Sequence, residues 1–133
     1  MVEQLKYIWL DGELVPWESA KIHVLTHGLH YGLGVFEGIR CYETSTGKGA
    51  FFRLEEHIRR LFDSAKVVGL TIPYNFDQVT TACVDIVKEN DRQDAYVRPI
   101  AFSGLSSFAA CRNRSSRPCR YSVLTSAILC SKS

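Results

Sequence analysis

The chain has 133 residues, of which 46% are hydrophobic and 23% charged, and its formal net charge at pH 7 is +2. This length suits one domain with its own core, and the composition excludes a disordered or fibrous protein. No apolar run reaches the roughly 18 residues of a membrane-spanning helix, and residues 1–6 lack the features of a secretory signal. We therefore expect a cytoplasmic protein without membrane contact.

Charge and cysteine content divide the chain near Gly104. Residues 1–104 contain 11 Lys and Arg and all 14 Asp and Glu, a net charge of −3. Residues 105–133 contain five basic residues, no acidic residue and three of the five cysteines. Because no cysteines form a C-x-x-C pair, we expect free thiols in a reducing compartment.

A hairpin is predicted at the start of the chain. Residues 7–10 are rich in β-formers, and residues 13–15 are suited to the returning strand. The Asp11-Gly12 dipeptide between them is typical of a two-residue hairpin turn.

A glycine-rich stretch follows at residues 27–42, with glycines at positions 28, 32, 34 and 38. Glycine allows tight turns and close approach of the backbone to a ligand, and aromatic and charged residues lie between these glycines. We interpret the stretch as one wall of a small-molecule pocket that runs into a strand. A plain turn before a hairpin is the alternative. The spacing matches neither glycine motif of nucleotide-binding proteins.

Three histidines before and within this stretch, His23, His27 and His30, have the spacing of metal ligands on one helical face. The nearby glycines argue against a helix, and no acidic or thiol ligand follows at a suitable distance. We expect no metal site, and histidines that make ordinary hydrogen bonds.

Residues 35–42 are predicted to form a strand, residues 44–49 a turn and residues 50–53 the returning strand. Since residues two apart share a face of a strand, Phe36, Gly38 and Arg40 are expected to face the same way. A ring, a gap and a guanidinium on one face suit a ligand with an apolar part and an anionic part. An ion pair with a neighbouring carboxylate is the alternative for Arg40.

Apolar residues spaced three and four apart predict a helix over residues 55–70, which Gly69 is placed to end. Arg59 and Arg60 lie beside its apolar stripe. Such an arginine is usually solvated or paired with a nearby acid such as Glu56.

A second helix is predicted to begin at Asn75, because Gln78 three residues later completes a capping-box signature, and to end near Asn90. Residues 96–102 then read as a strand in which Tyr96 and Arg98 share one face. Two hairpins, two helices and a further strand favour an α+β fold with helices packed on an antiparallel sheet.

Three segments in this order resemble the class IV pyridoxal-phosphate aminotransferases, and within them the branched-chain amino acid aminotransferases: His30–Gly32, Val35–Arg40 and Ala95–Pro99. The resemblance runs from about Tyr7 to Gly104. It implies the small N-terminal domain of that fold, and an enzyme that transfers the amino group of leucine, isoleucine or valine to 2-oxoglutarate.

The resemblance also implies roles for individual residues. Arg60 would bind the phosphate of pyridoxal 5'-phosphate, as a bidentate guanidinium can. Arg98 would hold the second carboxylate of glutamate. Tyr31 would reach into the partner's site of a homo-oligomer. The full set implied for substrate binding is Tyr31, Phe36, Gly38, Arg40, Tyr96 and Arg98.

Members of this family continue into a larger domain that supplies the lysine bound to the cofactor, which acts as nucleophile and proton carrier. No lysine here occupies that position, so no catalytic residue is assigned and we expect the chain alone to be inactive. Residues 105–133 are expected to be an unrelated tail, rich in Ser, Arg and Cys, that is disordered or encoded in a shifted frame.

Two alternatives remain open. One is another class IV enzyme, such as a D-amino acid aminotransferase or an aminodeoxychorismate lyase. The other is a non-catalytic fragment whose basic tail, with Arg112, Arg114, Arg117 and Arg120, binds an acidic partner. Nucleic acid is not expected as a partner, because few aromatic residues interleave these arginines. Apolar faces that would pack on a missing domain predict low solubility.

Overall fold

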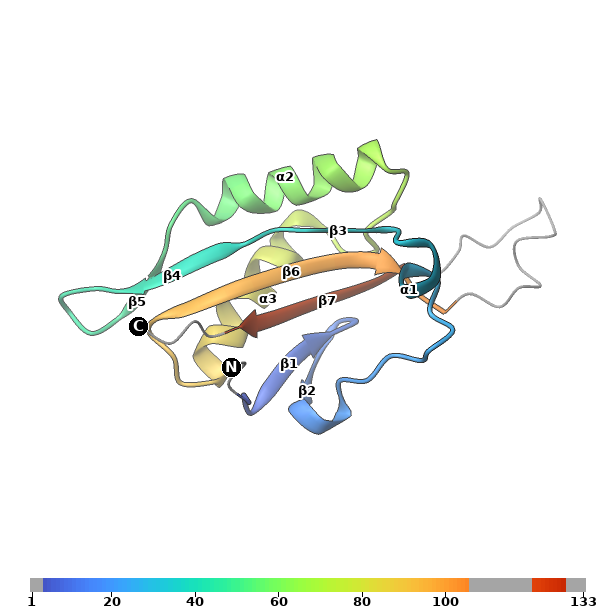
Figure 1. Cartoon of the computed structure of the whole chain (residues 1–133). Helices are drawn as coiled ribbons and strands as arrows, with labels where there is room; N and C mark the ends of the chain where they lie inside the picture. The colour runs from blue at the N-terminus through green and yellow to red at the C-terminus, as the bar shows by residue number, and fades with distance from the viewer. Residues whose placement is uncertain (1–3, 106–120, 129–133) are drawn as a thin grey trace.

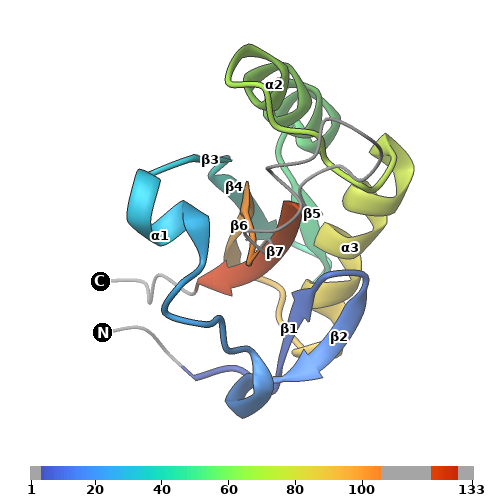
Figure 2. The same ribbon diagram turned by 90° about the vertical axis from the view of Figure 1, so that its right-hand side faces the viewer.

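A computed structural model describes residues 4–105 and the backbone of residues 121–128. In these ranges, seven strands form one antiparallel sheet. In chain order the strands are β1 (Tyr7–Leu10), β2 (Glu13–Pro16), β3 (Gly34–Phe36), β4 (Ile39–Glu43), β5 (Gly49–Phe51), β6 (Ala95–Ser103) and β7 (Tyr121–Ile128). The order across the sheet is β2-β1-β7-β6-β4-β5, and β3 pairs with β6 in line with β4. Two long helices, α2 (Leu54–Val67) and α3 (Phe76–Glu89), pack on one face of the sheet, and the short helix α1 (His27–Tyr31) lies on the other side (Figures 1 and 2). The predicted α+β arrangement of antiparallel hairpins and two packed helices is confirmed.

The first hairpin is confirmed, with β1 at Tyr7–Leu10 paired to β2 at Glu13–Pro16. Asp11 and Gly12 both have positive φ, of 49° and 98°. Two positive φ values in a row define the type I′ turn, whose twist matches that of the flanking strands. A single 3-10 turn, Trp17–Ser19, follows.

The glycine-rich stretch contains a helix that the sequence did not predict, α1 at His27–Tyr31. It is about one turn long, and Gly32 ends it with a left-handed φ of 66° while its N–H donates to the carbonyl of Gly28. The expectation that glycines prevent a helix here is wrong. Gly32 instead serves as the residue that a helix needs just beyond its end.

The single strand predicted for residues 35–42 is interrupted. The structure has β3 at Gly34–Phe36 and β4 at Ile39–Glu43, both paired in one unbroken register with β6 at Ala95–Ser103. The register places Glu37 opposite Pro99. The Glu37 N–H donates to the Pro99 carbonyl, 3.0 Å away, but proline has no N–H to return the bond. The ladder therefore breaks at Glu37 and Gly38 without any shift in register.

The remaining elements follow the predictions closely. β5 at Gly49–Phe51 returns along β4, and α2 spans Leu54–Val67. Gly69, with φ of 72°, and Leu70 donate back to carbonyls of the last turn of α2 in a Schellman arrangement. Asn75 and Gln78 cap α3, Phe76–Glu89, with both reciprocal bonds of a capping box.

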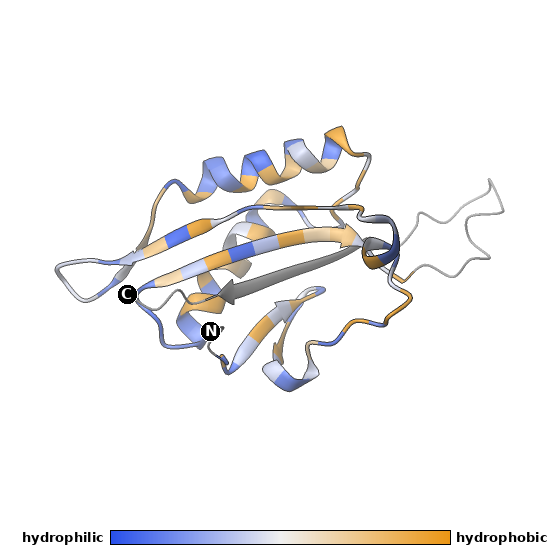
Figure 3. Ribbon diagram, in the orientation of Figure 1, coloured by the Kyte–Doolittle hydropathy of each residue, from blue (hydrophilic) through white to orange (hydrophobic). Residues whose placement is uncertain are grey.

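The core lies between the sheet and the two long helices. Among its side chains without solvent exposure are Ile39 and Val97 from the sheet, Ile58 and Leu61 from α2, and Ile86 from α3. Burying each such side chain contributes about 1.5–3 kcal/mol relative to leaving it in water. Hydrophilic residues line the outer side of α2 (Figure 3). Helix α2 thus turns one apolar face to the sheet, as its sequence period predicted.

Cys41 and Cys83 are buried and free, as predicted for them; the other three cysteines lie outside the described residues. Burial raises the pKa of the Cys83 thiol to about 12. None of the helices in the described ranges has the length and hydropathy needed to cross a membrane.

Beyond Gly104, residues Tyr121–Ile128 form β7 between β1 and β6. The sequence predicted a tail that is disordered or encoded in a shifted frame; the strand at these 8 residues differs from the first alternative and does not test the second. Their sequence, YSVLTSAI, is rich in β-formers, and an inserted strand supplies backbone partners to two strand edges at once. The rest of the predicted tail lies outside the described residues.

Candidate functional site

Five predicted site residues share the sheet face that points away from α2 and α3. We call Phe36, Gly38, Arg40, Tyr96 and Arg98 the site face. Along β6, Ala95 and Val97 are buried against the helices, whereas Tyr96 and Arg98, which alternate with them, are only partly buried. Because the register continues across the break, Gly38 lies opposite Arg98, and Arg40 pairs with Tyr96. The predicted common face of Phe36, Gly38 and Arg40 is confirmed.

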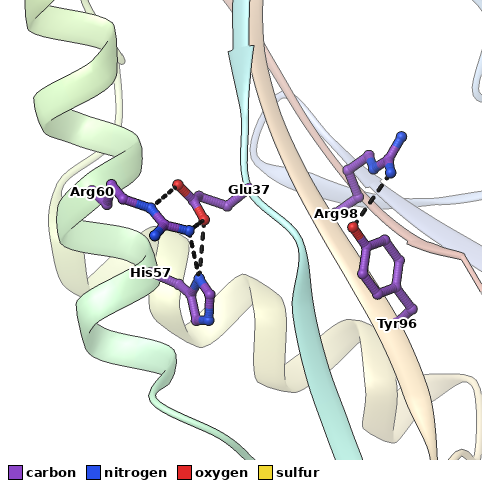
Figure 4. Close-up of polar contacts among 5 residues, drawn as sticks. All are labelled: Glu37, His57, Arg60, Tyr96 and Arg98. Atoms are coloured by element: carbon purple, nitrogen blue, oxygen red, sulfur yellow. Dashed lines mark hydrogen bonds and ion pairs between the residues drawn. The ribbon is translucent and has the colours of Figure 1, made fainter.

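Arg98 lies between two aromatic rings on the site face. Its guanidinium carbon is 4.9 Å from the centre of the Phe36 ring and 5.4 Å from that of Tyr96. Its Nη2 also donates to the Tyr96 hydroxyl at 3.3 Å (Figure 4). Ring faces attract a cation and limit its rotation, so the guanidinium is held in a defined orientation. Such a cation suits a carboxylate ligand.

Gly38 makes room for this arrangement. A Cβ atom at position 38 would overlap the hydroxyl of Tyr96. The Tyr96 ring can therefore lie across the sheet toward Arg98 only because residue 38 has no side chain.

Arg40 forms an ion pair with a neighbouring carboxylate, which was the alternative role considered for it from the sequence. Its Nη2 lies 3.4 Å from Asp94 Oδ1, and its guanidinium lies 5.3 Å from the centre of the Tyr42 ring. Arg40 is thus beside Tyr96 in the sheet but is engaged by an ion pair at the other end of the site face.

An apolar cavity of about 380 Å³ adjoins the site face. Residues of α1, β3 and β6 line it, including Leu29, Phe36, Ile100 and Phe102. Phe36 contacts both this cavity and Arg98, so one ring adjoins an apolar space and a cation. Cavities of about 420 Å³ near Lys48 and about 340 Å³ near Tyr74 contain none of the predicted site residues.

Tyr31 does not join the site face. It lies at the end of α1 with 71% of its surface exposed, and its ring meets that of His27 edge-on at 5.5 Å. It is not among the residues that line the apolar cavity.

Arg60 lies on the helix side of the sheet and is bound by Glu37. Arg60 donates from Nε to Oε1 at 2.6 Å and from Nη2 to Oε2 at 2.5 Å. His57 Nδ1 lies 3.0 Å from the same Oε2 (Figure 4). The Glu37 side chain is 5% exposed, while that of Arg60 is 65% exposed. The strands β3 and β4 separate this ion pair from Tyr96 and Arg98 (Figure 4).

Glu37 is not among the site residues predicted from the sequence. Glu56 was predicted as a possible partner for an arginine of α2, but Glu56 pairs with Arg53 at 3.1 Å. A signal was present in the strand period, since Val35, Glu37, Ile39 and Cys41 share the face that packs on the helices. A single carboxylate in such a row requires a buried or bridging cation.

Glu37 is ionised at neutral pH. Burial alone would raise the pKa of its carboxyl, but hydrogen bonds and charge from Arg60 and His57 outweigh burial and hold the pKa below its usual value. The same hydrogen bond raises the pKa of Arg60.

Arg60 fits a phosphate ligand. A guanidinium has five N–H donors, and Glu37 engages only the edge formed by Nε and Nη2. Nη2 also lies 3.3 Å from His57 Nδ1, so the Nη1 side of the outer edge remains for a phosphate oxygen, a group that arginine binds well.

No three His, Cys, Asp or Glu side chains among the described residues are grouped as a metal ion would need. His23 and His30 make local hydrogen bonds instead, His23 Nδ1 with the N–H of Leu25 and His30 Nε2 with the carbonyl of Val24.

The family model described as amino-transferase class IV matches residues 34–128, and so includes β7, beyond the Gly104 boundary drawn from the sequence. A branched-chain-amino-acid aminotransferase of Pseudomonas aeruginosa is 51% identical over 104 residues, which are 78% of this chain and 34% of that protein. The chain spans about a third of the length of the curated relatives it matches.

Solved structures of two enzymes resemble the fold. A branched-chain amino acid aminotransferase from Escherichia coli matches with a TM-score of 0.83 and 40% identity, over 93% of this chain and 41% of that one. The branched-chain amino acid aminotransferase of Thermobaculum terrenum in its PLP form matches with a TM-score of 0.77 and 30% identity, over 98% of this chain and 42% of that one.

Proposed function

Because the chain belongs to the class IV aminotransferase family, we propose that it forms the small domain of a branched-chain amino acid aminotransferase. Two relatives share about half of their aligned residues with this chain, and both are named branched-chain-amino-acid aminotransferases. The observation that carries the proposal is that Phe36 both lines the apolar cavity and contacts the Arg98 guanidinium. An aliphatic side chain and a carboxylate are the two ends of leucine, isoleucine and valine and of their 2-oxo acids.

Each group on the site face has a role in this proposal. Phe36 and the cavity exclude water from an aliphatic side chain. Arg98, oriented by Tyr96, binds a carboxylate, including the second carboxylate of 2-oxoglutarate or glutamate. Gly38 keeps the space that Tyr96 needs. Arg40 assists from the far end of the face, and Tyr31 contributes to the site of a partner copy in a homo-oligomer.

The cofactor proposed for the reaction is pyridoxal 5'-phosphate, held in part by Arg60. When bound, this group supplies the electron sink for amino-group transfer. The lysine that must bind it covalently is not assigned to any position of this chain. The chain alone is therefore proposed to be inactive, and the full activity belongs to a protein about three times as long.

The proposal places the reaction in the cytoplasm. The two buried free thiols favour this, since reducing compartments keep cysteines unpaired. The division of the chain at Gly104 stays a prediction. The alternative of a basic tail that binds an acidic partner concerns arginines outside the described residues.

The test is a chimera in which residues 1–104 replace the aligned part of the E. coli enzyme. It should transfer amino groups from L-leucine, L-isoleucine and L-valine to 2-oxoglutarate. Arg98→Gln in the chimera should raise KM for 2-oxoglutarate about tenfold or more, because one charge-assisted pair is lost. Lys48→Gln, on the β4–β5 turn, is the matched control and should change neither constant.

Two results would oppose the proposal. Preference for D-amino acids would assign the chain to another class IV enzyme. A folded chimera that binds the cofactor but transfers no amino group would show that the site face has no role in amino-group transfer.

A further inference from the structure

Glu37 has no role in the site as assigned so far, yet it is the buried carboxylate at the point where the sheet ladder breaks. Its backbone N–H is held by the Pro99 carbonyl at 3.0 Å. Its side chain crosses to α2, where His57 and Arg60 bind both carboxylate oxygens. The carboxylate is thus fixed from the strand on one side and from the helix on the other.

This fixed carboxylate determines how Arg60 is presented. The Arg60 side chain is 65% exposed, so without Glu37 it would sample many rotamers in water. Two parallel hydrogen bonds to Glu37 hold the planar guanidinium by its Nε–Nη2 edge. The opposite edge, formed by Nη1 and the second N–H of Nη2, then points away from Glu37, and Nη2 also lies 3.3 Å from His57 Nδ1. An anion that binds this edge meets a cation that is already ordered.

We propose that Glu37 is a positioning residue for a phosphate monoester: it holds Arg60 by one edge so that the other edge binds the cofactor phosphate. His57 supports the same carboxylate from one turn earlier on α2. This inference rests on the proposed role of Arg60 in binding pyridoxal 5'-phosphate.

The test uses the full 133-residue chain and two probes, inorganic phosphate and pyridoxal 5'-phosphate. Binding is followed by NMR through the backbone N–H signals of α2, and also through the Nε–Hε signal of Arg60 in every protein that keeps this arginine. Arg60→Gln should weaken phosphate binding about tenfold, since a bidentate charged contact is removed. Glu37→Gln should weaken it about three- to tenfold, because the guanidinium loses its fixed orientation while it keeps its charge.

Two features distinguish positioning from other effects. In the Arg60→Gln background, Glu37→Gln should change phosphate affinity less than about twofold, because Glu37 acts only through Arg60. In wild type, the Arg60 Nε–Hε signal should exchange slowly with water, and Glu37→Gln should broaden it. Glu37→Asp keeps the charge on a shorter side chain. It should therefore restore part of the phosphate affinity and part of the slow exchange of the Arg60 signal that Glu37→Gln loses.

The chain offers matched controls on the same helix. Glu56 forms an exposed ion pair with Arg53, and Arg59 adjoins Arg60. Glu56→Gln and Arg59→Gln should leave phosphate binding unchanged. If Glu37→Gln fails to fold, Glu37→Asp decides: an Arg60 Nε–Hε signal that broadens while phosphate affinity stays unchanged overturns the proposal.

The outcomes separate the inference from the function on which it rests. If Arg60→Gln weakens binding and Glu37→Gln does not, only the positioning role is wrong. Tighter phosphate binding in Glu37→Gln would show a carboxylate that only repels the anion, and would also overturn the role. If Arg60→Gln has no effect, the cofactor role of Arg60 fails and the positioning role fails with it.

Discussion

At the scale of single residues, Glu37 links the stability of the fold to pH. The pKa of its carboxyl in the folded chain lies below the ordinary value of 4.5, because Arg60 and His57 stabilise the charged form more than burial opposes it. A carboxyl with a lowered folded pKa stabilises the fold above its unfolded pKa. That contribution is lost as the pH falls through the folded value.

We therefore expect the free energy of unfolding to fall more steeply below pH 4.5 in wild type than in Glu37→Gln. Urea denaturation at pH values between about 7 and about 3 measures this difference. Comparison with the variant removes the effects of Glu56 and Asp91, whose carboxyl pKa values are also lowered. Parallel pH profiles for the two proteins would show that Glu37 has no such linkage.

The common face of Phe36, Gly38 and Arg40 could be predicted from sequence, whereas the partner of Arg60 could not. Phe36, Gly38 and Arg40 share a face through the two-residue period of a strand, which is a local property. The pairing of Glu37 with Arg60 depends on where α2 crosses the sheet. The period of α2 predicts its apolar face, but it does not predict which strand residue lies beside its arginines.

At the scale of elements, the capping box of α3 is the clearest match between sequence and structure. The Asn75 side chain accepts from the N–H of Gln78 at 2.8 Å, and the Gln78 side chain accepts from the N–H of Asn75 at 2.9 Å. These bonds satisfy donors that the first turn of a helix leaves unpaired. The motif works from sequence because both partners lie within four residues.

Asn75→Ala should lower the free energy of unfolding by about 1 kcal/mol, the usual contribution of an N-cap side chain. Gln78→Ala, which keeps the cap itself, should cost less than Asn75→Ala. Urea denaturation of the three proteins at neutral pH checks both expectations. Equal stability of wild type and Asn75→Ala would show that the cap does not stabilise α3.

Elements that depend on distant residues were predicted less well. The break between β3 and β4 follows from Pro99, which meets Glu37 only after the sheet has formed. The helix α1 was not predicted because glycine is unfavourable inside a helix, whereas Gly32 lies just beyond the end of this one. Strand β7 gains its partners from β1 and β6, so its pairing is a property of the sheet rather than of residues 121–128 alone.

At the scale of the whole molecule, the segment before β3 carries many exposed apolar side chains. Val24 is 70% exposed, Leu25 56%, Leu29 60% and Tyr31 71%. Leu29 also lines the apolar cavity with Phe36. Exposed apolar side chains gathered on one short segment are typical of an interface. The chain spans about a third of the length of its curated relatives.

The predicted low solubility then has a defined origin, and we expect the isolated chain to self-associate through residues 22–36. Val24→Lys combined with Leu29→Lys should shift the chain toward monomer, since two charges oppose burial of the apolar surface. Sedimentation velocity over a range of concentrations measures the shift. The stability of the fold should change by less than about 0.5 kcal/mol, because both side chains are exposed.

Val67→Lys is the matched control for this prediction. Val67 is 86% exposed at the end of α2, on the opposite side of the sheet from α1. If exposed apolar area anywhere drives association, Val67→Lys should help as much as either substitution near α1. We expect instead that it leaves the concentration dependence unchanged, because association needs a continuous surface and Val67 lies outside it. A wild-type chain that stays monomeric at high concentration would show that residues 22–36 form no self-complementary surface.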